Sequence, residues 1–108
     1  MTDKVKVARK RVGAPQIELL MIENGVEGFD SLMGETPYEV VAFGMLPEGI
    51  QVLLNAERNT DGSKPNILGM RGDMVFYRTE NNSILDLTNE DIAELEKLIK
   101  VFGGYGNG

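Results

Sequence analysis

The chain has 108 residues, 42% of them hydrophobic and 26% charged, and a net charge of −6 at pH 7. These values are typical of a globular protein, and we expect a single domain over residues 1–102 followed by a flexible glycine-rich tail over residues 103–108. Cysteine and histidine are both absent, which excludes disulfides, zinc sites of the usual kinds, and Ser-His or Cys-His nucleophile pairs.

The first elements expected are two strands joined by a turn at residues 13–15, because apolar and polar residues alternate on both sides of that turn. The alternating apolar residues are Val5 and Val7 in the first strand and Ile17, Leu19 and Met21 in the second. A short helix follows, with Asn24 as its N-cap and Gly34 as its C-terminal stop.

Two hairpins are expected next. The first turns at Pro47-Glu48-Gly49, and the second turns at Glu80-Asn81-Asn82, where asparagine tolerates the left-handed backbone of a tight turn. Four methionines lie in apolar patterns and are expected in the core: Met21, Met33, Met45 and Met74.

The last element expected is a helix that begins with a capping box formed by Thr88 and Asp91 and ends at Gly103. Its apolar stripe consists of Ile92, Leu95, Ile99 and Phe102. The predicted order is therefore β-β-α-β-β-β-β-α. This order indicates a small α+β domain with a largely antiparallel sheet and both helices packed on one face.

Residues 34–73 carry a pattern of a helix ending at glycine, a strand, a glycine-containing turn, a strand ending in asparagine, and a polar loop leading into another strand. The segments that carry it are Gly34, YEVVAF, GIQVLLNAE, Pro65-Asn66 and GMRGDMVF. The pattern resembles a family of small domains of unknown function found in phages, plasmids and other bacterial mobile elements. The family usually has a second glycine where this chain has Glu35, and here the connection before Pro65 is charged. The resemblance implies a phage or mobile-element origin and no established activity.

A polar connection, NAERNTDGSKPN, joins two expected strands between Asn55 and Asn66. Loops this long in compact domains are usually functional or disordered. Because amides both donate and accept hydrogen bonds and guanidinium groups bind phosphate, the loop suits a ligand with phosphate or ribose groups. The expected ligand-binding residues are Asn55, Arg58, Asn59, Lys64, Asn66 and, in the GMRGD segment that follows, Arg71. The alternative is a structural loop whose two terminal asparagines satisfy backbone groups.

Catalysis and metal binding are not expected. The absence of histidine removes the side chain best suited to proton transfer near neutral pH. Glu18, Glu39 and Glu57 are candidate catalytic carboxylates, but no sequence spacing brings two of them together. We therefore assign no catalytic residue, no metal ligand and no cofactor.

The charge is unevenly distributed. Residues 1–12 contain five basic residues and one acidic residue, a net charge of +4, so the remaining residues carry −10. An acidic body repels nucleic acid, which is therefore not expected as a partner. No apolar run approaches the roughly 18 residues that span a membrane, and no signal-peptide pattern opens the chain, so we expect a cytoplasmic protein of a bacterial host. Because a domain of this size buries only a moderate fraction of its surface, we expect a homo-oligomer that associates through strands near the basic residues 1–12 or through the 73–87 hairpin.

Three functions remain open. The first is a non-catalytic protein that sequesters a nucleotide-derived signalling molecule and so inhibits host anti-phage defence. It is preferred because sequestration needs only a pocket and because the polar loop is mixed in charge. The second is an acidic inhibitor that binds a host defence protein directly. The third is a small enzyme that uses carboxylates only.

Overall fold

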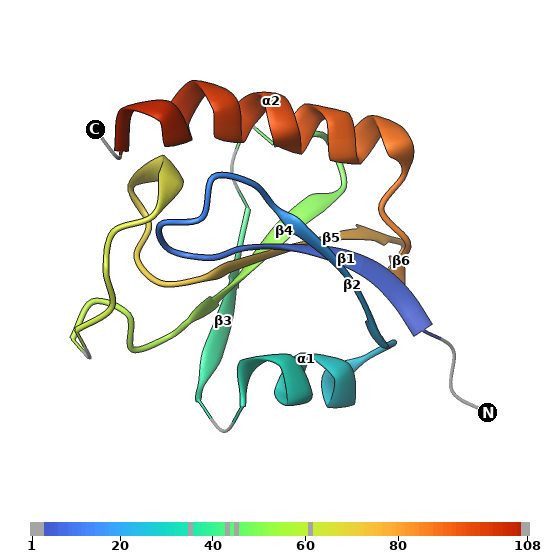
Figure 1. Ribbon diagram of the computed structural model, residues 1–108. Coiled ribbons are helices and arrows are strands. Elements are labelled where there is room, and N and C mark those ends of the chain that lie inside the picture. The colour runs from blue at the N-terminus through green and yellow to red at the C-terminus, as the bar shows by residue number, and fades with distance from the viewer. Residues whose placement is uncertain (1–3, 35, 43, 45, 61, 107–108) are drawn as a thin grey trace.

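The computed structural model describes the backbone of residues 4–34, 36–42, 44, 46–60 and 62–106, and the side chains of these residues except 68 and 102–106 (Figure 1). The elements in chain order are β1 (Lys4–Lys10), β2 (Glu18–Glu23), α1 (Val26–Met33), β3 (Tyr38–Val41), β4 (Ile50–Asn55), the short 3-10 helix η1 (Ile67–Gly69), β5 (Met74–Glu80), β6 (Ser83–Leu85) and α2 (Asn89–Gly106). The predicted α+β class and element order are confirmed.

One sheet contains all the strands, in the order β2-β1-β5-β4-β3, with β6 paired to β5. Each of these pairings is antiparallel, as predicted. The β3–β4 hairpin turns where expected: the amide of Ile50 donates to the carbonyl of Pro47 (3.1 Å), and Gly49 has φ 89°. The β5–β6 hairpin turns on Asn81 and Asn82, which have φ values of 52° and 67°. A turn that needs left-handed backbone at both central residues favours asparagine, so both predicted turns are confirmed.

The two helices lie on opposite faces of the sheet, α2 above it and α1 below it in Figure 1. Alternate residues of β5 divide between two cores: Met74 and Phe76 pack with Leu95 and Ile99 of α2, whereas Val75 and Tyr77 pack with Phe29 of α1. The prediction that both helices cover one face is wrong. Strands whose successive residues are all apolar are covered on both faces, and the VFY run of β5 has that character.

The side-chain alternation of β2 is the reverse of the one predicted. Leu20 and Ile22 pack against the α1 core, while Leu19 and Met21 are 48% and 54% exposed. The sequence ELLMIE is apolar at both alternating sets of positions, so the pattern does not decide which set points inward. Of the methionines expected in the core, Met21 is therefore wrong, Met74 is confirmed at 0% exposure, Met33 is partly buried, and Met45 lies outside the described residues.

Three glycines determine where α1 begins, where it ends and how closely it approaches the preceding strand. Gly25 is the N-cap, without a side-chain hydrogen bond, so the prediction of Asn24 as N-cap is wrong. The side-chain amide of Asn24 donates instead to the backbone carbonyl of Ile84 (3.1 Å), which joins the end of β2 to β6. Gly34, with φ 71°, ends the helix as predicted. A Cβ at Gly28 would lie 1.8 Å from the carbonyl oxygen of Glu23, so only glycine allows this close approach of helix and strand.

The predicted capping box of α2 is confirmed. The amide of Asp91 donates to the hydroxyl of Thr88 (3.0 Å), and the amide of Thr88 donates back to the carboxylate of Asp91 (2.8 Å). The predicted end at Gly103 is wrong, because α2 continues to Gly106. A glycine inside a helix costs only about 1 kcal/mol relative to alanine, so it does not by itself stop one.

Candidate ligand-binding pocket

The beginning of the polar loop is held by its own side chains. The Asn55 side-chain oxygen accepts a hydrogen bond from the amide of Glu57 (2.8 Å). The guanidinium of Arg58 pairs with the carboxylate of Glu39 on β3 and donates to the carbonyl of Asn55 (3.0 Å). Only 11% of the Arg58 side chain is exposed. Arg58 therefore links the loop to the sheet, whereas Asn59 lies exposed at the loop surface.

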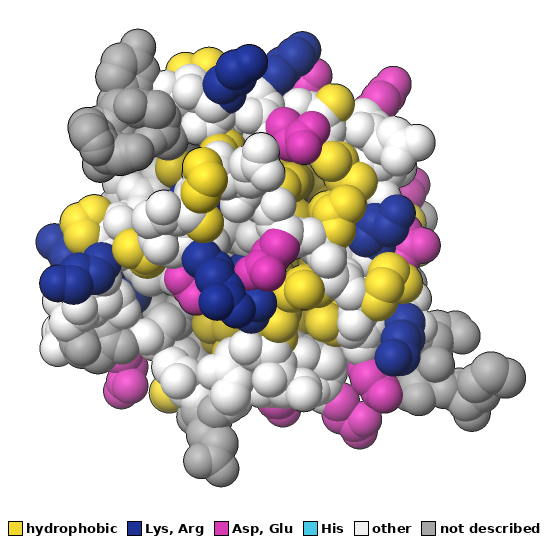
Figure 2. Space-filling view, in the orientation of Figure 1, with side chains coloured by type: hydrophobic (Ala, Val, Ile, Leu, Met, Phe, Trp, Pro, Cys, Tyr) yellow, Lys and Arg dark blue, Asp and Glu magenta, His cyan; other side chains and the backbone are white. Residues whose placement is uncertain are grey.

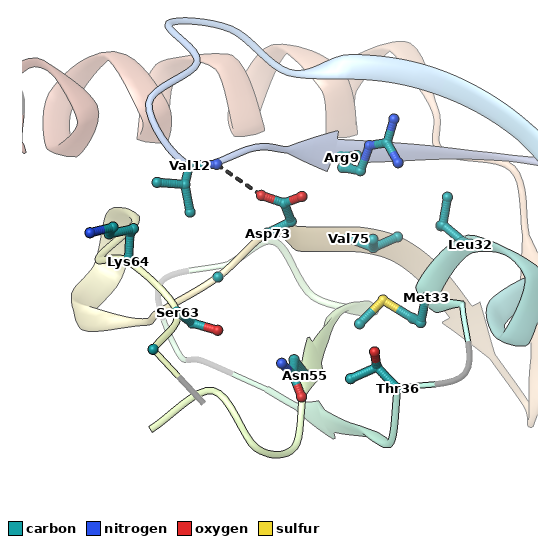
Figure 3. Close-up of a pocket in the computed structure, with 12 residues that line it drawn as sticks. Arg9, Val12, Leu32, Met33, Thr36, Asn55, Ser63, Lys64, Asp73 and Val75 are labelled. Atoms are coloured by element: carbon teal, nitrogen blue, oxygen red, sulfur yellow. Dashed lines mark hydrogen bonds between the residues drawn. The ribbon is translucent and has the colours of Figure 1, made fainter. Parts of the chain in front are cut away.

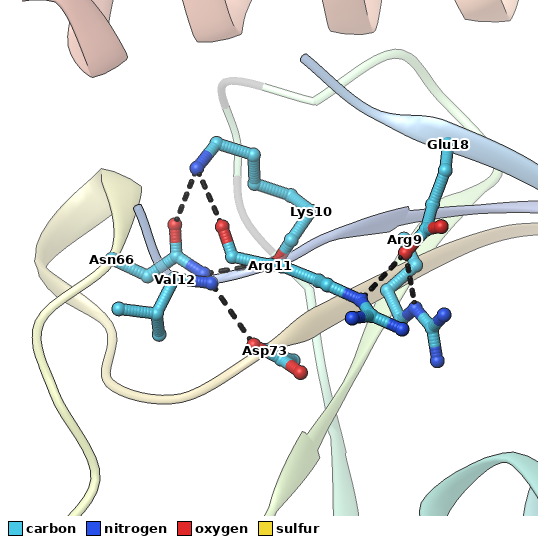
Figure 4. A network of polar contacts seen from close by, with 7 residues as sticks. All are labelled: Arg9, Lys10, Arg11, Val12, Glu18, Asn66 and Asp73. Carbon is cyan, nitrogen blue, oxygen red and sulfur yellow. Dashed lines mark hydrogen bonds and ion pairs between the residues drawn. The ribbon is translucent and has the colours of Figure 1, made fainter. Parts of the chain in front are cut away.

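At the C-terminal end of the polar loop, the side chain of Asn66 makes four hydrogen bonds. Its side-chain oxygen accepts from the amide of Ile67 (2.9 Å) and from the ammonium of Lys10 (3.2 Å). Its side-chain amide donates to the carbonyls of Lys10 (3.0 Å) and Gly72 (2.8 Å). These contacts, drawn in part in Figure 4, give Asn66 the backbone-capping role that was the alternative to ligand binding.

Lys10 lies beneath this loop and is only 4% exposed. Burial lowers the pKa of its ammonium, and the nearby carboxylate of Asp73 opposes part of that effect. Besides Asn66, the ammonium donates to the carbonyl of Arg11 (2.8 Å). A buried ammonium satisfied by two oxygens acts here as a structural tie between β1 and the loop.

Residues 63–72 fold back on themselves. The amide of Gly72 donates to the carbonyl of Lys64 (2.8 Å), and the guanidinium of Arg71 donates to the carbonyl of Ser63 (3.0 Å). Pro65 and Arg71 form an isolated antiparallel bridge. This arrangement fixes the Lys64 backbone at the rim of a cavity.

A pocket of about 360 Å³ opens between this folded loop, the end of α1 and the sheet (Figure 3). Its walls come from β1, β4, β5, α1 and the loop, and the lining residues are Arg9, Val12, Leu32, Met33, Thr36, Asn55, Gly62, Ser63, Lys64, Gly72, Asp73 and Val75. The volume is near the lower end of the range for small-molecule sites, about 300–1,000 Å³. Of the six residues expected to bind a ligand, the structure places Asn55 and Lys64 here.

The pocket is lined by both polar and apolar residues. In Figure 3, Ser63 and Lys64 lie on the loop side, and Leu32, Met33 and Val75 lie on the opposite side, with Asp73 between them. The carboxylate of Asp73 accepts a hydrogen bond from the amide of Val12 (2.9 Å). Such an amphipathic lining, with a few polar groups at defined places, is typical of a site for a small organic ligand.

Arg9 reaches the pocket from β1 and is oriented by Glu18 on β2 (Figure 4). The Nε atom of Arg9 lies 2.7 Å from a Glu18 carboxylate oxygen, and the Nε atom of Arg11 lies 2.8 Å from the same oxygen. The hydrogen bond from Arg9 is the main reason that the pKa of Glu18 is lowered. The Arg9 atom that binds Glu18 is Nε.

Arg9 and Asp73 were not expected from the sequence to belong to a site. Arg9 occurs in a basic run that is typical of a protected edge strand, and Asp73 is one acidic residue among many. Neither lies in the polar loop between Asn55 and Asn66, although Asp73 ends the GMRGD segment that follows the loop. For Arg9, the available signal was that Arg9 and Lys10 alternate along a strand, which places their side chains on opposite faces.

A second cavity, of about 280 Å³, lies between the β1–β2 turn and α2. It is lined by Pro15, Gln16, Ile17, Glu96, Ile99 and Lys100. Its carboxylate and ammonium come from one helix face and offset each other, so it has no net charge to select a ligand. Within the described residues, no group of three or more acidic side chains is placed to hold a metal ion.

Comparisons of the chain with protein-family models, with curated proteins and with solved structures find no match. The resemblance to mobile-element proteins therefore stays a prediction. Among the described residues, no helix is long and apolar enough to cross a membrane.

Proposed function

We propose that the protein binds a small nucleotide-derived ligand in the pocket beside Asp73 and does not transform it. The observation that carries this proposal is that one cavity of about 360 Å³ is lined by two basic residues, Arg9 and Lys64, by the acidic Asp73 and by an apolar wall. A nucleotide has the matching parts, because it combines an anionic phosphate, ribose hydroxyls and a flat, largely apolar base.

The lining suggests how each part of the ligand is held. The phosphate lies at the loop side, near the ammonium of Lys64 and the backbone at Gly62 and Gly72, where the absence of side chains allows close approach. The ribose hydroxyls donate to Asp73. A carboxylate accepts about four hydrogen bonds, so the one from Val12 leaves room for a ligand hydroxyl.

The base lies against the apolar wall, which is formed by Leu32, Met33 and Val75. Methionine adapts its shape to flat ring systems and makes favourable contacts with them. Thr36 and Asn55 line the pocket near this wall in Figure 3 and supply hydroxyl and amide groups that can read the edge of the base.

In biological terms, we propose that binding removes a nucleotide-derived signal of host anti-phage defence, in keeping with the mobile-element origin that the sequence resemblance implies. Sequestration requires only high affinity for the ligand, and it requires no catalytic acid, catalytic base or metal ion. A chain without histidine or cysteine is suited to that task. The second candidate, an inhibitor that binds a host defence protein, is favoured by the net charge of −10 outside residues 1–12, which would complement a basic partner surface.

The direct test is thermal unfolding of the wild-type protein with and without nucleoside monophosphates, cyclic nucleotides and ADP-ribose derivatives. A ligand at a hundredfold excess over its dissociation constant stabilises the folded state by about 2.7 kcal/mol, which is readily measured as a rise in melting temperature. Isothermal titration of any hit gives its affinity, and analysis of the recovered ligand shows whether it was altered. If no compound raises the melting temperature, the small-ligand function is rejected in favour of the protein-binding one.

A further inference from the structure

The outer side of β2 forms an edge of the sheet that lacks the usual protection against pairing. Natural edge strands are kept apart by inward-pointing charges, proline, bulges or short length. In β2 the charged residues stand only at the two ends, and the four residues between them, LLMI, are all apolar. The opposite edge, β3, has four residues and carries Glu39 within it.

Two exposed apolar side chains stand on the α2 face of this edge. Leu19 and Met21 pair in register with Ala8 and Lys6 of β1, and Ala8 belongs to the α2 core, so Leu19 and Met21 share that face. Each of these two side chains is about half exposed. Figure 2 shows apolar side chains in patches on the side of the molecule where β1 and β2 lie nearest the viewer.

We propose that β2 pairs with β2 of a second copy of the chain, antiparallel, about a two-fold axis perpendicular to the sheet. The two sheets then become one continuous sheet, with the α2 helices on one face and the α1 helices on the other. The backbone groups on the outer side of β2 find partners, and the exposed apolar residues of both copies are brought together.

The side chains select one register for this pairing. An axis perpendicular to the sheet keeps each face on its own side, so residues opposite each other must point to the same face. With Leu20 on the axis, Leu19 of each copy lies opposite Met21 of the other, which gathers four apolar side chains into one patch. With Met21 on the axis, Leu19 would instead lie opposite the charged Glu23, which is less favourable.

The charges of β2 are compatible with the Leu20-centred register. Glu18 and Glu23 point to opposite faces, so the carboxylates of the two copies do not meet across the interface. Glu18 is paired with Arg9 and Arg11 of its own chain, and Glu23 lies opposite Lys4 in the β1–β2 register. No uncompensated carboxylate is therefore brought to the new strand pair.

Helix α1 leaves space for the second copy. The helix starts after β2 and runs beneath the sheet, away from the β2 edge. Its central residue, Phe29, has its ring centroid 4.9 Å from that of Tyr77 on β5 and 6.3 Å from that of Tyr38 on β3. The other region expected to form contacts, the 73–87 hairpin, is not an available edge, because β5 has β4 on one side and β1 and β6 on the other.

The mass in solution tests the interface. Light scattering of the wild-type protein is expected to give the mass of two chains, and Met21→Lys is expected to give the mass of one chain with an unchanged melting temperature at low concentration. The matched control is Val40→Lys on the opposite edge, which replaces a residue of similar exposure (47%, against 54% for Met21) and is expected to keep the mass of two chains. A wild-type protein of single-chain mass, or a dimer that only Val40→Lys disrupts, overturns the proposal.

The register is tested by cross-linking, which the absence of native cysteine makes straightforward. In the Leu20-centred register, position 19 of one copy lies opposite position 21 of the other, and neither lies opposite itself. An equimolar mixture of Leu19→Cys and Met21→Cys is therefore expected to form disulfide-linked dimers with oxidised glutathione, while each variant alone forms few. Rapid linking of Met21→Cys by itself indicates the other register and contradicts the one proposed.

Discussion

Arg78 on β5 and Asp91 in the first turn of α2 form a two-bond ion pair, in which Nε and Nη2 of the guanidinium lie 2.7 and 2.6 Å from the two carboxylate oxygens. Asp91 is only 2% exposed, and the same carboxylate accepts the Thr88 amide of the capping box. One side chain thus caps the helix and fastens it to the central strand. The start of α2 and its docking on the sheet are therefore coupled.

Asp91→Asn tests this coupling. Asparagine retains an oxygen for the Thr88 amide but removes the charge that Arg78 needs, which leaves a guanidinium that is 22% exposed without its partner. Removing one member of a buried ion pair costs about 3–5 kcal/mol, and some solvent access to Arg78 places the expected loss near about 3 kcal/mol. Urea unfolding measures it. Glu94→Gln is the control, because its exposed pair with Lys97 contributes about 0.5 kcal/mol or less.

The same pair predicts a pH dependence of stability. The hydrogen bond from Arg78 is the main cause that lowers the pKa of Asp91, with further lowering from Thr88, against the opposing effect of burial. A lowered carboxyl pKa stabilises the fold above the ordinary value of about 3.9, and this contribution is lost as the pH falls below that value toward the folded pKa. The difference in unfolding free energy between wild type and Asp91→Asn should be constant from pH 5 to 7 and shrink in more acidic solution. A difference that stays constant at low pH would contradict the assignment.

Local signals in the sequence were sufficient for the caps and turns. The Thr88–Asp91 box and the Asn81-Asn82 turn depend on residues within three positions of each other, so the pattern alone determines them. The ion pair to Arg78 was not predicted, because it joins a strand to a helix thirteen residues away and depends on how α2 is placed over the sheet. Sequence periodicity predicts that a helix or strand forms, but it does not predict which other element that helix or strand packs against.

The pocket was predicted only in part for the same reason. Two residues of the long polar loop, Asn55 and Lys64, line the pocket. Arg9 lies in β1 and Asp73 immediately precedes β5, and these two strands become neighbours only after the sheet forms. The sequence also does not predict which residues of β2 are buried, because both alternating sets of its residues include apolar ones.

Asn66→Ala is expected to destabilise the protein strongly, although the residue lies in a loop. The substitution removes one of the two oxygens that bind the Lys10 ammonium, and it removes the side-chain amide that donates to the carbonyls of Lys10 and Gly72. Unsatisfied buried polar groups cost about 1–3 kcal/mol each, and relaxation of the loop toward solvent should limit the total to about 2–4 kcal/mol. Chemical denaturation provides the measurement, with Asn59→Ala as the exposed control, expected within about 0.5 kcal/mol of wild type. Equal stability of the two variants would show that the Asn66 network is unimportant.

Gly28→Ala is expected to lower stability despite the higher helix propensity of alanine. Propensity alone would favour alanine by about 1 kcal/mol. The added methyl group would, however, meet the backbone carbonyl of Glu23 at 1.8 Å, and separating the helix from the strand should cost about 1–3 kcal/mol more than the propensity gain. Gly44→Ala is the control, because a Cβ there meets nothing within 4 Å among the described residues. A more stable Gly28→Ala would mean that α1 shifts freely on the sheet.

Lys64→Ala and Arg58→Ala separate ligand binding from loop structure. Lys64 lines the pocket, and no carboxylate among the described residues forms an ion pair with it, whereas Arg58 is bound to Glu39 and to the Asn55 carbonyl. Hydrogen bonds to charged groups contribute about 1.5–3 kcal/mol, so Lys64→Ala should weaken the affinity for a phosphate-bearing ligand by about tenfold to a hundredfold with unfolding free energy nearly unchanged.

Arg58→Ala should show the converse, a loss of about 1–2 kcal/mol in stability with affinity nearly unchanged, because Glu39 loses its ion-pair partner and the Asn55 carbonyl keeps only the backbone amide of residue 58. Isothermal titration and urea unfolding of the same samples measure both quantities. Lys97→Ala, an exposed lysine of α2 away from the pocket, controls for the loss of one positive charge and should bind as wild type does. A charge that acts only at long range would lower the ligand affinity of Lys64→Ala and of Lys97→Ala equally. An affinity of Lys64→Ala tenfold below that of Lys97→Ala would therefore place the phosphate at Lys64. Normal binding by Lys64→Ala together with weak binding by Arg58→Ala would instead move the site to the beginning of the loop.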